Sequence, residues 1–195
     1  KTGDLDGEII LNGLQLGSFY KYAMQYAKIN ALNGRLDAIM NIHGNIDALK
    51  DAIIATKVTL HEFEMKDTSN QTFLASNEVT AIMPDINPMK DLIVVQSLKI
   101  DQPYVKFELD SISNNYFRIF DYQFEDAYTA ADSTNPAETE YYNYEIYKIT
   151  VNEGTMDYTD NLTGGPFNYH LSAISASSDS ILSDSEWVDI TSDML

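Results

Sequence analysis

The sequence predicts a mainly β fold, in which a curved antiparallel sheet of repeated kinked strands carries one N-terminal amphipathic helix packed on it. Apolar residues alternate with other residues along most of the chain, the alternation breaks in the same way in four segments, and one longer segment has helical spacing. The 195 residues are 44% hydrophobic and 11% aromatic, which is typical of a folded chain with an ordinary core.

Four segments share one spacing of apolar residues, with successive steps of two, three and two. Alternate residues of a strand point to one face, so a step of three inserts one residue and indicates a β-bulge or kink. The residues that end the long step are Leu14, Phe63, Pro103 and Gly154. Proline and glycine at an aligned position favour a kink, because regular central strands disfavour both. We interpret the segments as repeats of one supersecondary unit, the alternative being coincidence among β-rich segments.

Three further segments alternate and are expected to add strands to the sheet. They are Leu36 to Ile42, Val79 to Met83 and Phe167 to Ala173. A helix is expected at about residues 18–32, because Ser18 can cap it and apolar residues then recur at helical spacing. Its apolar stripe is Phe19, Tyr22, Ala23, Tyr26 and Ala27. Asn33-Gly34 is expected to end it.

The chain divides into three parts by composition. Residues 1–120 are predicted to be a β-sheet module that includes the helix. Residues 121–140 are acidic and poor in aliphatic residues, so we expect a loop or linker there. Residues 141–195 are expected to continue the same sheet and to end in a frayed tail rich in Ser and Asp.

Charge and composition exclude several classes of function. With 12 basic and 30 acidic residues the net charge is −18, which would repel nucleic acid. The chain has no Cys, and therefore no disulfide, no Cys-ligated zinc and no thiol catalysis. It has three histidines and none of the usual catalytic or nucleotide-binding motifs. We therefore expect no enzyme activity, no catalytic residues, no metal site and no cofactor.

Several blocks of the chain resemble the AsmA-like family of bacterial envelope proteins, including its branch known only as a domain of unknown function. The resemblance covers about residues 7–120 and 141–175. Its blocks are NGRLDAIMNIHG (33–44), ATKVTLHEFEMKD (55–67), MPDINPMKDLIVVQSLKIDQPYVKFELD (83–110), NNYFRIF (114–120) and YKITVNEGTMDYTD (147–160). The chain departs from the family at Ser111-Ile112-Ser113, where the family has a glycine before the Asn-aromatic block.

The resemblance implies a non-enzymatic segment of a longer protein that extends into the periplasm from an inner-membrane anchor outside this segment. Implied partners are neighbouring segments of the same protein and phospholipid, and the implied role is outer-membrane biogenesis or phospholipid transport through an apolar β-groove. A one-sided apolar sheet suits this role, because each CH₂ removed from water contributes about 0.8 kcal/mol without directional contacts.

Eight apolar residues of the repeated strands are candidates to line such a groove. They are Val58, Leu60, Leu98, Ile100, Val105, Phe107, Ile149 and Val151. The same alternation also fits a closed core in which these residues pack under the helix, so the sequence leaves both interpretations open.

A different class of function remains as an alternative. The chain has 13 tyrosines, and four of them lie close together at positions 141, 142, 144 and 147. A secreted or surface β-sandwich could bind glycans by stacking sugar rings on such side chains. Tyrosine is also simply a favourable strand residue.

Overall fold

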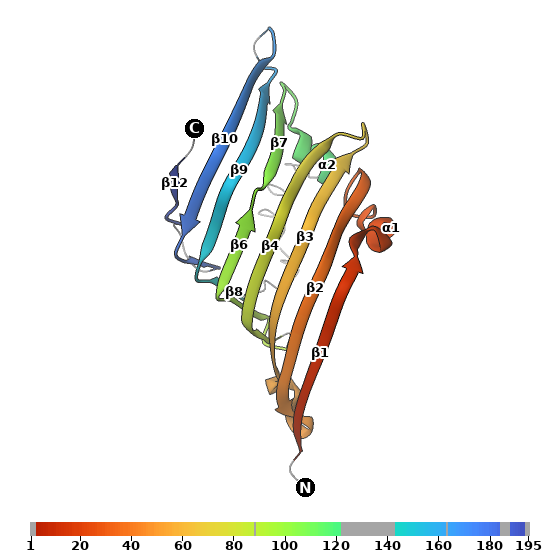
Figure 1. The fold of residues 1–195 in the computed structure, drawn as a ribbon, viewed down its shortest axis with the longest axis vertical. Coiled ribbons are helices and arrows are strands. Elements are labelled where there is room, and N and C mark those ends of the chain that lie inside the picture. The colour runs from red at the N-terminus through yellow and green to blue at the C-terminus, as the bar shows by residue number, and fades with distance from the viewer. Residues whose placement is uncertain (1–2, 88, 122–142, 163, 184–187, 194–195) are drawn as a thin grey trace, which may run out of the picture.

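The strands form one strongly curved β-sheet in the computed structural model, which describes residues 3–87, 89–121, 143–162, 164–183 and 188–193. The N-terminal half is an antiparallel meander of four long strands (Figure 1). These are β1 (Asp4–Gln15), β2 (Ile29–Asn45), β3 (Ile53–Asp67) and β4 (Thr72–Asn87).

The C-terminal half continues the same sheet. Its strands are β5 (Leu92–Val95), β6 (Ser97–Asp101), β7 (Tyr104–Leu109), β8 (Asn143–Ile146), β9 (Ile149–Asp160), β10 (Phe167–Ser178), β11 (Ile181–Leu182) and β12 (Thr191–Asp193). Across the described residues the main order is β1-β2-β3-β4-β6-β9-β10-β12. Beyond the end of β6, β7 takes its place between β4 and β9.

The mainly β, curved sheet with a short N-terminal helix is confirmed. The pairings β5·β8, β6·β9 and β7·β9 are parallel, which strand alternation alone could not indicate.

The predicted kinks are present in all four repeats. The residue that precedes the end of each long step has positive φ: Gly13 (70°), Glu62 (50°), Gln102 (49°) and Glu153 (51°). A residue in this left-handed conformation is typical of a bulge that bends its strand.

Two more kinks occur where the sequence analysis missed them. Ala173 has φ 50° and shifts the register of β10, so the uninterrupted alternation expected from Phe167 to Ala173 is wrong. Gly34 has φ 136° inside β2, so Asn33-Gly34 bends a strand instead of ending a helix. We call five of the bent positions, Gly34, Glu62, Gln102, Glu153 and Ala173, the kink line. They lie at one level of the sheet on the two sides of β4, which has no residue of positive φ.

The N-terminal helical segment is shorter than residues 18–32. It consists of the 3₁₀ helix η1 (Leu16–Phe19) and one turn of α-helix, α1 (Tyr20–Ala23), and β2 begins at Ile29. The expected apolar stripe is also wrong in part, because Phe19, Tyr22 and Tyr26 are exposed. A helix of this length cannot bury a long stripe, and the strand pairing of Ile29 to Leu32 with β3 takes precedence over helical spacing.

A small core lies under α1 and the second helix, α2 (Asn115–Phe120). It contains Ala27, Ile29, Phe73 and Ile119, and Tyr20 and Ala23 pack against it. The Tyr116 hydroxyl donates to the Phe73 carbonyl at 3.0 Å. Asn115 is buried and bonds the edge of β7, accepting from the Glu108 amide at 2.9 Å and donating to the Lys106 carbonyl at 2.7 Å. In this way α2 occupies the place where β4 and β7 diverge.

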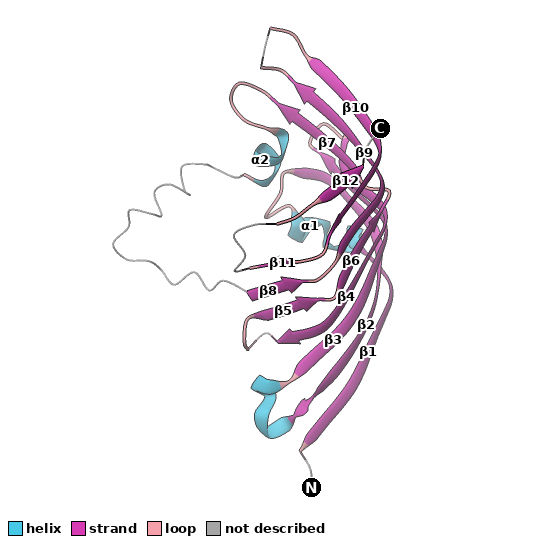
Figure 2. Ribbon diagram, turned by 90° about the vertical axis from the view of Figure 1, so that its left-hand side faces the viewer, coloured by secondary structure: helices cyan, strands magenta, loops and turns pink. Residues whose placement is uncertain are grey.

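The sheet has a convex and a concave side. Both α-helices and the short 3₁₀ helix η2 (Ile46–Asp51) lie on the concave side, as do β5, β8 and β11 (Figure 2). Among the described residues, no helix is long and apolar enough to cross a membrane.

The described part of residues 141–195 joins the sheet of residues 1–120. Of the expected frayed tail, Thr191 to Asp193 pair with β10, whereas residues 184–187 and 194–195 lie outside the described residues. The expected acidic loop at 121–140 lies outside the described residues apart from Asp121, which ends α2.

Candidate binding groove on the concave face

Two uninterrupted rows of paired residues cross the sheet from β1 to β10. Directly paired residues on neighbouring strands point to the same face. The first row is Leu14, Leu36, Leu60, Val79, Ile100, Val151 and Ala176. The second row is Leu11, Ala38, Val58, Ala81, Leu98, Ile149 and Ser178. All but Ser178 are apolar, so the repeated strands share one continuous apolar face.

A third row lies on the other side of the kink line. It consists of Leu32, Met65, Leu74, Val105, Met156 and Leu171. Beside it, Phe107 pairs with Tyr158, whose ring is stacked on that of Phe107 at 5.9 Å between centroids. The Phe107 ring also stacks on Tyr116 of α2 at 5.9 Å. Because α2 lies on the concave side, these contacts place the apolar face there (Figure 2).

A hollow of about 430 Å³ opens on this face where the rows meet at the kink line. Its lining includes Phe63, Val79, Ile100, Val105, Met156 and Ile174, and no lining residue is charged. This volume lies within the range of about 300–1,000 Å³ that small-molecule sites usually have. The hollow can therefore take an uncharged, apolar ligand or part of one.

The structure brings the eight predicted groove residues onto this one face. Ile100, Val105 and Val151 line the hollow. Val58, Leu60, Leu98 and Ile149 lie in the first two rows, and Phe107 lies beyond the third. All eight are half-buried, and none belongs to the core under the helices. Of the eight, Phe107 stacks on Tyr116 of α2, and Leu60 lies with Leu16 of η1 around Gly34.

Several residues of the hollow were missed by the sequence analysis. Ile174 was overlooked because the kink at Ala173 was not recognised. This kink shifts the alternation of β10 by one residue, so that Ile174 falls outside the pattern that starts at Phe167. Phe63 and Met156 belonged to the repeated pattern but were not selected as groove residues. The step of three from Leu171 to Ile174 is the signal that could have found Ile174.

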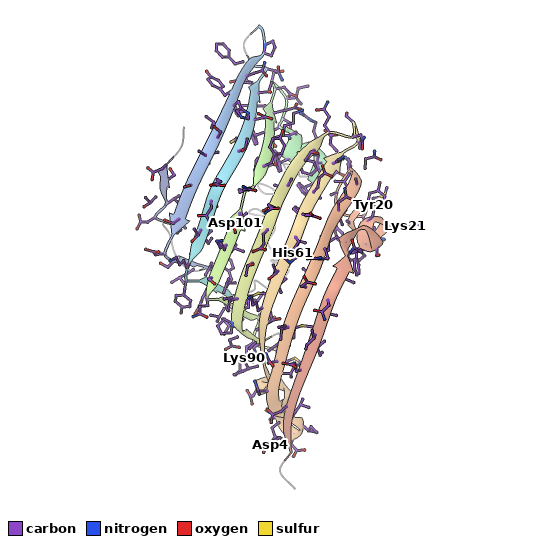
Figure 3. All side chains as sticks on the ribbon, viewed as in Figure 1. Asp4, Tyr20, Lys21, His61, Lys90 and Asp101 are labelled. Carbon is purple, nitrogen blue, oxygen red and sulfur yellow. The ribbon has the colours of Figure 1, made fainter. Side chains whose placement is uncertain are left out.

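The opposite, convex face carries ion pairs at the same level of the sheet. The His61 ring nitrogens lie 3.2 Å from Asp37 and 3.4 Å from Glu78. Lys99 lies 2.6 Å from Asp101, and this hydrogen bond, followed by one from Asn152, lowers the pKa of Asp101. His61 and Asp101 lie in the middle of the sheet (Figure 3). At this level of the sheet these charged side chains thus lie on the face opposite the apolar rows.

The described residues do not gather a set of metal ligands. In this part of the chain, no three His, Asp or Glu side chains are placed to hold a metal ion. The remaining histidines pair with single carboxylates, His43 with Asp6 at 2.7 Å and His170 with Asp157 at 2.6 Å.

The tyrosines of the alternative glycan site are only partly placed. Tyr141 and Tyr142 lie outside the described residues. Tyr144 and Tyr147 are exposed, and the Tyr147 hydroxyl donates to Glu145 at 2.8 Å. The described strands form one sheet, whereas that alternative predicts a two-layered sandwich.

Comparisons with known proteins give no relative for this chain. No family model, no curated protein and no solved structure matches it.

Proposed function

We propose that this chain is a non-catalytic segment of an AsmA-like protein of the bacterial envelope, and that its concave face binds the acyl chains of phospholipids. The observation that carries the proposal is the pair of apolar rows, which run across the whole sheet and stay half-buried in the described structure except at Ala38 and Ser178, which are buried. The resemblance of the sequence blocks to that family supports the assignment to the envelope.

The chemistry of the two faces suits a lipid. An acyl chain needs apolar surface and no directional contacts, and each CH₂ buried contributes about 0.8 kcal/mol. The hollow is lined by residues without charge, so an acyl chain can enter it without desolvating an ion. A phospholipid headgroup carries charges that such a lining cannot solvate, so it stays at the rim of the groove, in water.

The role that follows is outer-membrane biogenesis or movement of phospholipid across the periplasm. The inner-membrane anchor and the neighbouring segments that the role requires belong to the full-length protein. The outer edge of β1 and most of the outer edge of β10 pair with no other strand among the described residues. Neighbouring segments could continue the sheet at such edges.

The proposal is tested by analysing the lipid that the protein carries. The chain is purified without detergent, extracted with organic solvent, and the extract is analysed by mass spectrometry. An unrelated acidic β-protein is treated identically. We expect phospholipid in stoichiometric amount from this chain and none from the control. A clean extract would contradict the proposal and would favour a closed apolar core.

Two matched variants locate the lipid on the sheet. Ile100→Glu places a carboxylate in the first row and in the lining of the hollow. Ile82→Glu places the same group on β4 between Ala81 and Met83, hence on the convex face, where Ile82 is 37% exposed. We expect the first variant to lose at least fivefold of the bound lipid and the second to keep it. Equal loss in both variants would argue against the concave face as the site.

A further inference from the structure

The connection between β1 and β2 carries a cluster of exposed apolar side chains, which we call the aromatic corner. It consists of Phe19, Tyr22, Met24 and Tyr26, with exposed fractions of 45%, 61%, 50% and 63%. The rings of Tyr22 and Tyr26 lie 5.3 Å apart. Tyr20 and Ala23 of the same segment face the core instead. Large apolar side chains that gather at one exposed place mark an interaction surface.

The aromatic corner lies in a part of the chain without negative charge. Residues 9–36 contain no Asp or Glu, although the whole chain contains 30. Of the three cations in this stretch, Lys28 pairs with Asp121 at 2.6 Å and Arg35 lies 3.6 Å from Asp37. Lys21 makes no ion pair with any described residue. The corner therefore carries one cation, Lys21, that no described carboxylate neutralises by an ion pair, in a protein of net charge −18.

The aromatic corner also stands beside the β1 end of the apolar rows. Leu14 ends the first row, and η1 begins at Leu16. Leu16 and Leu60 approach each other over Gly34: a Cβ at Gly34 would lie 3.2 Å from Leu16 Cδ1 and 3.3 Å from Leu60 Cδ1. Helix α1 lies on the concave side, and Tyr20 and Lys21 mark its place at the edge of the sheet (Figures 2 and 3).

We propose that the aromatic corner docks the protein on the surface of a phospholipid bilayer. Tyrosine rings combine an apolar body with a polar tip, which suits the boundary between acyl chains and headgroups. Lys21 can reach lipid phosphates while its methylenes stay with the rings. The acidic remainder of the chain is repelled by the same phosphates, so the charge distribution orients the molecule with this corner toward the membrane. Docking here would bring the β1 end of the groove against lipid.

Flotation with phosphatidylcholine vesicles in physiological salt tests the docking. We expect the unmodified chain to float with the vesicles and the double variant Tyr22→Ser, Tyr26→Ser to show at least a fivefold smaller bound fraction. The matched control is Met89→Ser, Ile112→Ser, which removes two apolar side chains that are 71% and 93% exposed elsewhere. This control should bind like the unmodified chain. Absence of binding by the unmodified chain, or equal loss in both variants, would overturn the proposal.

Two further measurements separate docking from other roles of this surface. Lipid extracted from the Tyr22, Tyr26 double variant should equal that of the unmodified chain, because neither residue lines the hollow. Docking and groove binding can therefore fail independently. Light scattering measures self-association. If the unmodified chain is a dimer that the double variant breaks, and vesicles bind neither form, the corner is an interface between copies and the proposal is wrong.

Discussion

Gly154 and Pro103, which end the long step in two different repeats, lie against each other in the folded sheet. A Cβ at Gly154 would lie 3.2 Å from Pro103 Cγ and 3.3 Å from Ile174 Cβ. The Thr155 amide donates to the Pro103 carbonyl at 2.8 Å. The bent residues before them are also joined, since Gln102 Nε2 donates to Glu153 Oε2 at 3.0 Å. Because β7 and β9 run parallel, the kinks of two repeats coincide at one level.

A side chain at Gly154 should disturb this contact. Gly154→Val is expected to lower the free energy of unfolding by about 1–3 kcal/mol, because its methyl groups would overpack the space between Pro103 and Ile174. Gly154→Ala should cost less. Urea unfolding measures both. Gly7→Val in β1 is the control, since nothing lies within 4 Å of a Cβ there. Equal effects at the two glycines would show that the contact is not tight.

The left-handed conformation of Ala173 should make this residue a site of strain. A non-glycine residue costs about 1–2 kcal/mol in that conformation, whereas glycine in a regular strand costs about 0.5–1 kcal/mol relative to alanine. Ala173→Gly is therefore expected to stabilise the fold by about 0.5 kcal/mol. Ala176→Gly, at a paired position of β10 without positive φ, should destabilise it. Thermal unfolding gives the sign, and destabilisation by both changes would contradict the assigned kink.

Asn115 should be required at the edge of β7. Asn115→Leu leaves the Glu108 amide and the Lys106 carbonyl without their partner, and we expect a loss of about 1–3 kcal/mol in urea unfolding. Asn168→Leu is the comparison, because Asn168 makes an exposed hydrogen bond with Thr159 and should change stability by less than about 0.5 kcal/mol. Similar losses in both variants would mean that α2 does not depend on this amide.

The raised pKa of Tyr104 should be visible in the pH dependence of the free energy of unfolding. Burial, and then its hydrogen bond to Asp157, raises the pKa of Tyr104 from 10.0 to about 12. Because the folded pKa is the higher one, this stabilisation is complete below pH 10 and is lost as the pH rises toward 12. Tyr104→Phe should therefore make the free energy of unfolding fall less steeply between pH 10 and 12. Burial also raises the pKa of Tyr116 to about 12, so part of the slope should remain. An unchanged slope in Tyr104→Phe would contradict this assignment.

The sequence was sufficient to predict the sheet, its apolar face and four of its kinks, because each of them produces a characteristic spacing of apolar residues along the chain. A step of three is visible wherever apolar residues flank it, as at Leu60 and Phe63. The kink at Gly34 was misread because Asn-Gly is typical of turns. The helix was overextended because Tyr22, Tyr26 and Ala27 have helical spacing, although two of the three are exposed.

Long-range features could not be predicted in the same way. The parallel pairing of β6 with β9 depends on the path of the chain after α2. The spacing of residues within either strand carries no information about this path. The hollow depends on Pro103 at the β6–β7 junction, Gly154 of β9 and Ile174 of β10 coming together. Such contacts are set by tertiary packing, which single-residue preferences do not contain.

The mixed pairing of the sheet has a consequence for the order in which it forms. The meander from β1 to β4 joins neighbours along the chain, whereas Leu98 of β6 pairs with Ile149 of β9, 51 positions later. Bringing residues together costs more conformational entropy when the chain between them is longer, and this cost is met before any contact forms. Pairings between distant strands are therefore slow to form. We expect pulse-labelled hydrogen exchange during refolding to protect the amides of β2 and β3 before those of β9. The N-terminal meander would then be the template on which the later strands assemble.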